Sequence, residues 1–155
     1  MIKEDNLLPP LLGATQIQKL LFKTGILNFA PLDCMYLKEI IENDTICIEV
    51  HFDRDAEAHN KKIITAEGKN AVNICQDVYY ELSGEGIIIE EYSFSSYFSK
   101  DYSHPQDLTV QQLSAVIYSE KSQKKFTVSS SGKKTYIRLL VDCLLDIFNR
   151  EHALA

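Results

Sequence analysis

Imidazole and carboxylate side chains alternate along one short segment, which contains His51, Asp53, Asp55, Glu57 and His59. Oxygen and nitrogen donors at this density could surround a divalent cation. A twelve-residue calcium loop beginning at Asp53 would need a glycine and a final glutamate where Ala58 and Ile64 stand. We therefore interpret the segment as a solvated strand end and turn, and we assign no metal ion to it.

A second set of groups overlaps the first. Asp53 or Asp55 follows one predicted strand, and Glu67-x-Lys69 follows the next. Two carboxylates can hold Mg²⁺, and a lysine can position the attacking water. With its flanking helices, this order resembles the restriction-endonuclease-like nucleases. The resemblance implies a Mg²⁺-dependent nuclease, which we keep as an alternative function.

A third set lies in a serine- and lysine-rich segment between a predicted strand and the last helix. A phosphate-binding loop would need its first glycine at Thr127, so the segment is not a Walker A motif. Cations in the first turn of a helix oppose its dipole, unless an anion binds the exposed N–H groups. This favours a phosphate- or nucleic-acid-binding module as another alternative, with the cations Lys124, Lys125, Lys133, Lys134 and Arg138.

Charge is divided unevenly along the chain. Residues 1–107 carry 18 acidic and 9 basic side chains, whereas residues 108–155 carry 4 acidic and 7 basic ones, and the whole chain has a net charge of −6. Such separation more often serves a partner than a fold. The carboxylates that we expect to face a partner are Glu49, Asp53, Asp55 and Glu57.

The function that we predict from this charge is binding. The serines form no nucleophile elbow, so we assign no catalytic residue and no cofactor. We expect an acidic, non-enzymatic binding or inhibitor protein that recognises a basic protein, as toxin-immunity and anti-defence proteins do. Carboxylates can occupy the phosphate-binding groove of a nuclease and accelerate association. Nucleic acid is a less favoured partner, because the pI is near 5.2.

Length and composition indicate the number of domains and the cellular compartment. A chain of 155 residues with 45% hydrophobic content predicts one globular domain, with an irregular N-terminal arm over residues 1–13. Four cysteines in apolar runs, without a C-x-x-C pair, are typical of buried free thiols in a reducing cytosol. The longest apolar run is too short for a membrane span, so we expect a cytoplasmic protein without membrane contact.

The elements that must position these groups follow from periodicity. Apolar residues alternate over 45–53, 61–66, 87–98 and 125–129, which predicts strands. Helical spacing or capping residues predict helices over 15–23, 33–42, 71–82, 109–118 and the C-terminal segment. The helices at 15–23 and 109–118 would begin with the capping boxes Thr15-x-x-Gln18 and Thr109-x-x-Gln112. Adjacent strands and mixed order indicate an α+β fold, in which helices pack on one antiparallel or mixed sheet and the long C-terminal helix lies in the core.

Overall fold

The computed structural model describes residues 13–28, 30–54, 62–98 and 109–152. Three helices and six strands follow in the order αβββαβββα. Their bounds are α1 Ala14–Lys23, β1 Asp33–Glu42, β2 Thr45–Asp53, β3 Lys62–Gly68, α2 Ala71–Ser83, β4 Ile87–Phe98, β5 Thr109–Ser119, β6 Lys124–Gly132 and α3 Tyr136–His152. The predicted arm over residues 1–13 lies outside the described residues, apart from Gly13.

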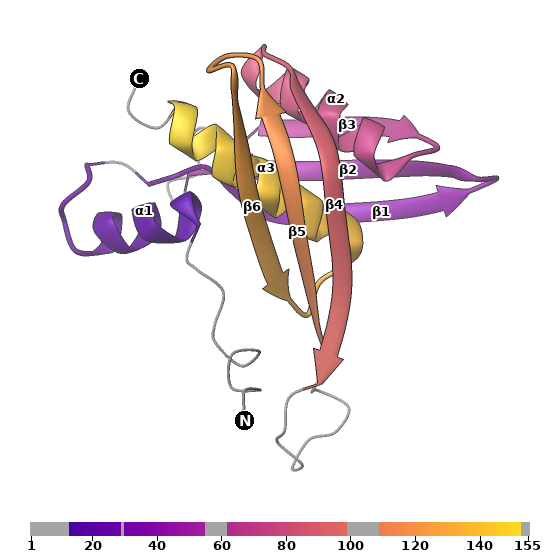
Figure 1. Cartoon of the computed structure of the whole chain (residues 1–155), viewed down its shortest axis with the longest axis horizontal. Coiled ribbons are helices and arrows are strands. Elements are labelled where there is room, and N and C mark those ends of the chain that lie inside the picture. The colour runs from indigo at the N-terminus through magenta and orange to yellow at the C-terminus, as the bar shows by residue number, and fades with distance from the viewer. Residues whose placement is uncertain (1–12, 29, 55–61, 99–108, 153–155) are drawn as a thin grey trace.

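The predicted α+β class is confirmed, but the strands form two sheets where the sequence predicts one. Sheet A has the strand order β1-β2-β3 and sheet B the order β4-β5-β6, and every pairing is antiparallel. The two sheets are crossed, and α3 runs between them (Figure 1). α3 contacts β1, β5 and β6, so it joins both sheets into one core.

The C-terminal helix is the centre of that core, as the sequence predicts. Every residue of its apolar stripe is buried: Ile137, Leu140, Val141, Leu144, Leu145 and Phe148. Leu139, Cys143 and Ile147 on the other side of the helix are buried too. A helix enclosed by sheets needs apolar residues around most of its circumference, which explains why its stripe is so wide.

The helix predicted over 33–42 is wrong, because this segment is strand β1. It pairs with β2 from Asp33↔Asp53 to Glu42↔Thr45. Asn43 and Asp44 make the turn of the hairpin with positive φ angles of 50° and 66°. Two-residue hairpin turns favour such residues, and the pair Asn-Asp between apolar runs was the missed signal.

The helix predicted over 109–118 is also wrong. This segment is β5, the central strand of sheet B, and its buried residues Leu113, Ala115 and Ile117 alternate as strand residues do. Thr109 and Gln112 therefore do not form a capping box. The strands predicted over 45–53 and 87–98 are confirmed with the same bounds, and the strands at 61–66 and 125–129 are confirmed with small shifts.

Local sequence explains the two ends of α2 but not the start of α1. The Asn70 side chain accepts a hydrogen bond of 2.8 Å from the Val72 amide at the start of α2, and Gly84 ends that helix with a φ of 78°. α1 has no side-chain cap of its own, so the predicted capping box of Thr15 and Gln18 is wrong. Instead, Asp146 of α3 accepts the Thr15 amide at 3.1 Å. No helix in the described ranges is long and apolar enough to cross a membrane.

Candidate functional site

The outer face of sheet A is a surface made by all three strands, and within the described part of the chain its side chains are exposed or half-buried. Its inner face carries Ile48, Val50 and Phe52 into the core with α2 and α3. Strand alternation turns the intervening residues outward, and the register aligns them in cross-strand rows. These rows are Tyr36–His51–Ile63, Lys38–Glu49–Thr65 and Ile40–Cys47–Glu67. We call these nine residues the outer face of sheet A.

The outer face combines apolar and acidic groups around a shallow hollow. The hollow has a volume of about 440 Å³, and its lining includes Ile40, Cys47 and Thr65. Tyr36, Ile40 and Ile63 are large exposed hydrophobic residues on this face. Its charged side chains, leaving His51 aside, are Lys38, Glu49 and Glu67, so the face is negative.

Short contacts fix several of these side chains. His51 Nε2 lies 2.7 Å from Glu49 Oε2, and the rings of His51 and Tyr36 meet edge to face with centroids 5.1 Å apart. The Cys47 thiol donates to Glu67 Oε2 at 3.5 Å, and desolvation together with this bond raises the pKa of the thiol. The face is thus a preformed surface: Glu49 is held by a neighbour on its own strand and Glu67 by one on the adjacent strand.

The predicted acidic residues do not all lie on this face. Glu49 does, but Asp53 is buried at the end of β2, where its Oδ1 accepts the Arg54 amide at 2.7 Å. Asp55 and Glu57 lie outside the described residues. The structure adds Glu67, which the sequence suggested only as a metal ligand. The alternation of side chains along β3, aligned with β2, is the signal that would have placed Glu67 beside Cys47.

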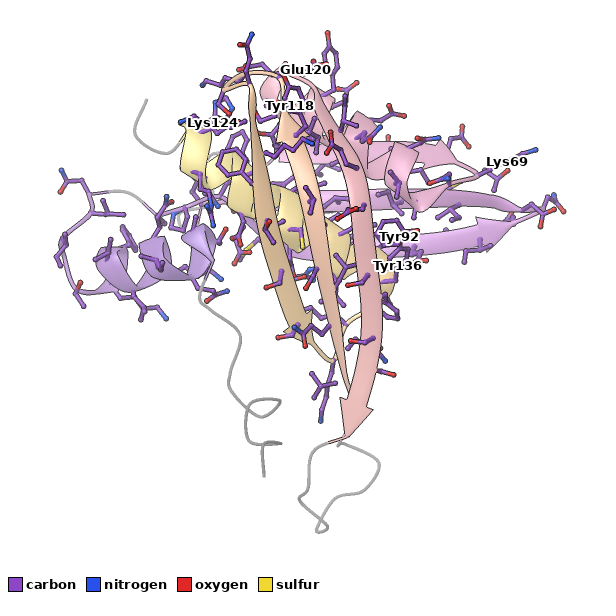
Figure 2. The ribbon with its side chains drawn as sticks, in the orientation of Figure 1. Lys69, Tyr92, Tyr118, Glu120, Lys124 and Tyr136 are labelled. Atoms are coloured by element: carbon purple, nitrogen blue, oxygen red, sulfur yellow. The ribbon has the colours of Figure 1, made fainter. Side chains whose placement is uncertain are left out.

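The structure does not bring Asp53 and Glu67 together, and Asp55, the alternative to Asp53, lies outside the described residues. Phe52 pairs with Lys62 while Cys47 pairs with Glu67, so Asp53 and Glu67 lie at opposite ends of the β2–β3 ladder. Six residues of strand separate them, which is about 20 Å. Lys69 lies at the end of sheet A where β3 leads into α2 (Figure 2). Within the described ranges, no group of three histidine, cysteine or acidic side chains could hold a metal ion.

The basic segment is divided between the two ends of β6. Lys124 lies at its start (Figure 2). The next residue, Lys125, pairs with Glu90 at 2.9 Å. Lys133 and Lys134 follow its other end, about 26 Å away for nine strand residues. The predicted cations therefore do not form one patch.

Lys134 and Arg138 do meet, in a polar cleft of about 310 Å³ between α1, β1, β6 and α3. Asp142 accepts both, from Lys134 Nζ at 2.8 Å and from Arg138 Nε at 3.4 Å. Lys19 on the cleft wall pairs with Asp33. Within the cleft, Asp142 and Asp33 thus pair with these three cations.

A buried polar network beside the cleft fixes α1 to α3, and sequence reasoning missed it. Asn149 is fully buried and bonds Thr15 Oγ1 at 2.9 Å, the Leu32 amide at 3.0 Å and the Leu32 carbonyl at 2.8 Å. Burial raises the pKa of Asp146, while the Thr15 bonds oppose this rise. A Cβ at Gly13 would lie 1.9 Å from Asp146 Oδ2, so this close approach requires glycine.

Another polar group closes the C-terminal end of α3. Ser119 donates to Glu151 Oε1 at 2.7 Å. The buried Tyr79 hydroxyl faces the same carboxylate, and burial and Glu151 both raise the pKa of Tyr79. His152 stacks on Phe148 with centroids 4.6 Å apart, and burial lowers the pKa of His152. These contacts hold the end of α3.

The comparisons with known proteins add no relative. No protein-family model matches the chain, and no curated protein matches its sequence.

Proposed function

We propose that this protein is a non-enzymatic, cytosolic binding protein that recognises a basic protein partner through the outer face of sheet A. The observation that carries the proposal is the composition of that face. Three exposed apolar side chains, Tyr36, Ile40 and Ile63, stand among the carboxylates Glu49 and Glu67. A monomer rarely leaves such a mixture on one surface without a use for it.

The two kinds of side chain have separate roles in this proposal. Burial of the apolar groups supplies affinity, because aromatic and large aliphatic anchors dominate most protein interfaces. The carboxylates raise the association rate and select the partner, since charge complementarity steers the encounter of two proteins more than it strengthens their complex. The net charge of −6 adds to the same field.

The class of protein that fits this chemistry is an inhibitor of a basic protein. In an immunity protein or an anti-defence inhibitor, carboxylates take the place of the phosphates that a nuclease would bind. The free cysteines agree with a reducing compartment: Cys34, Cys75 and Cys143 are buried, and no disulfide is present. The nuclease alternative has less support, because Asp53 is remote from Glu67.

The test compares proteins captured from cells of the native host by three purified baits. One bait is the wild type, and one carries Glu49→Lys and Glu67→Lys on the outer face. The matched control carries Asp77→Lys and Glu81→Lys, which make the same charge change on exposed positions of α2. Quantitative mass spectrometry measures what each bait retains.

We expect a basic protein that the wild type and the α2 variant retain and that the outer-face variant loses. If the outer-face variant retains the same proteins in the same amounts, this face is not the binding surface. Loss from both charge variants would mean that only the net charge matters.

A further inference from the structure

Strand β1 is an edge strand that carries exposed apolar side chains on both of its faces. Its one strand neighbour in the described part of the chain is β2. Met35, Tyr36, Ile40 and Ile41 are 54%, 50%, 42% and 65% exposed. Ile40 belongs to the outer face, while Ile41 pairs with Ile46 on the inner side. An exposed apolar edge of this kind invites pairing with another strand, and natural proteins usually protect it.

The edges of sheet B do carry such protection. β4 is interrupted by an irregularity between Ile89 and Glu91, although Ile88, Tyr92 and Phe94 on either side of it are exposed. β6 begins with Lys124 and Lys125. Bulges and lysines are two of the devices that keep an edge from pairing. β1 has one lysine among its ten residues. Its bulge lies near its start, between Cys34 and Tyr36.

The structure limits how much of β1 is available. Arg138 Nη2 donates to the Cys34 carbonyl at 2.8 Å, so the first residues of the strand are already engaged by α3. A groove of about 240 Å³, lined by Phe22 and Met35 among others, lies beside the same end. The stretch from Tyr36 to Glu42 remains, which is about 23 Å of strand.

From these observations we infer that an extended segment of the partner adds to sheet A as a fourth strand, along β1 from Tyr36 to Glu42. This inference rests on the proposed function and deepens it. Main-chain hydrogen bonds would hold the segment, and alternate side chains would give specificity. On the outer face, apolar side chains would lie beside Tyr36 and Ile40, and on the opposite face a basic one would lie beside Glu39.

Charge favours a different protein over a second copy of this chain. An antiparallel register that pairs Tyr36 with Ile40 of a second copy sets Lys38 against the same lysine of that copy. The register that pairs Leu37 with Ile41, which uses the whole stretch from Tyr36 to Glu42, sets Glu39 against Glu39. Pairing Ile40 with Ile40 sets Lys38 opposite Glu42, but it joins only residues 38–42 of each copy. Like charges directly opposite each other destabilise a strand pair. A basic segment meets neither conflict.

The test uses a synthetic ten-residue peptide of alternating valine and lysine, labelled with a fluorophore. One control peptide has a proline at its centre, which removes a main-chain donor and breaks strand pairing. The protein variant carries Ile40→Lys and Ile41→Lys. Its matched control is Ile88→Lys, an equally exposed isoleucine on β4 of sheet B. Fluorescence anisotropy measures affinity, and amide hydrogen exchange locates the bound peptide.

We expect the alternating peptide to protect alternate amides between Tyr36 and Glu42 from exchange. The proline peptide and the Ile40/Ile41 variant should each weaken binding at least tenfold, and Ile88→Lys should not change it. Binding without protection of β1 amides, or equal binding of the proline peptide, overturns the inference. Protection of the β1 amides that increases with protein concentration in the absence of peptide would identify a second copy as the occupant. That result would also overturn the inference.

The two proposals can fail separately. If Ile41→Lys, which lies off the outer face, still captures the partner that Glu49→Lys with Glu67→Lys loses, the proposed function stands and strand addition is wrong. If neither variant changes capture of a basic partner, both are wrong.

Discussion

Asn149 is the residue whose replacement tests the packing of α1 most sharply. Its side chain makes three hydrogen bonds, one to Thr15 Oγ1 and two to the main chain of Leu32, and none of it is exposed. Asn149→Ala removes all three and leaves the Leu32 amide and carbonyl buried without partners. A buried hydrogen bond contributes about 1 kcal/mol net, and an orphaned buried group costs about 1–3 kcal/mol. We therefore expect a loss of about 3–5 kcal/mol of unfolding free energy.

Urea denaturation followed by circular dichroism measures this loss. The matched control is Asn73→Ala on the exposed side of α2, which should change stability by less than about 0.5 kcal/mol. Thr15→Val removes the contact to α1 alone and should cost about 1 kcal/mol, so it stays measurable if Asn149→Ala does not fold. A loss below about 1 kcal/mol for Asn149→Ala would refute the reasoning, because the network would then not hold α1.

Three further outcomes follow from the site geometry. Burial raises the pKa of Asp146, so the folded state keeps its proton to higher pH than the unfolded chain does. Stability should fall as pH rises from the ordinary carboxylate range through the raised value, and Asp146→Asn should remove that fall in pH-dependent denaturation. Burial raises the pKa of Cys75 and of Cys143 to about 12, so at pH 8 a thiol reagent should modify neither until the protein is unfolded. Lys134→Gln should destabilise the protein by at most about 1 kcal/mol in thermal melts, because it breaks the pair with Asp142. A stabilising effect would restore the anion-site interpretation.

The elements with strong local periodicity were predicted correctly. The alternation from Thr45 to Asp53 and the apolar stripe of α3 each come from one segment, and both were right. β1 and β5 were missed because acidic or threonine residues at their starts imitate helix caps, while the pairing with β2 and β4 that makes them strands is not local. Tertiary pairing overrides weak propensity in this way.

The candidate site depended on register, which periodicity alone does not give. Glu49 was predicted to face outward and does, since alternation within β2 suffices for it. Glu67 lies on the same face because it pairs with Cys47 of β2. Asp53 does not contribute to that face, because it is buried at the end of its strand. The carboxylates that compensate Lys134 and Arg138 come from α3 and could be placed only once the fold was known.

The most direct test of the central claim measures association with the captured basic partner by stopped-flow fluorescence at several salt concentrations. Glu49→Lys with Glu67→Lys should lower the association rate and flatten its dependence on salt, because these carboxylates steer the encounter. The α2 pair Asp77→Lys with Glu81→Lys should change both quantities much less. If the outer-face variant keeps the wild-type rate and salt slope, the outer face of sheet A is not the surface that this protein uses.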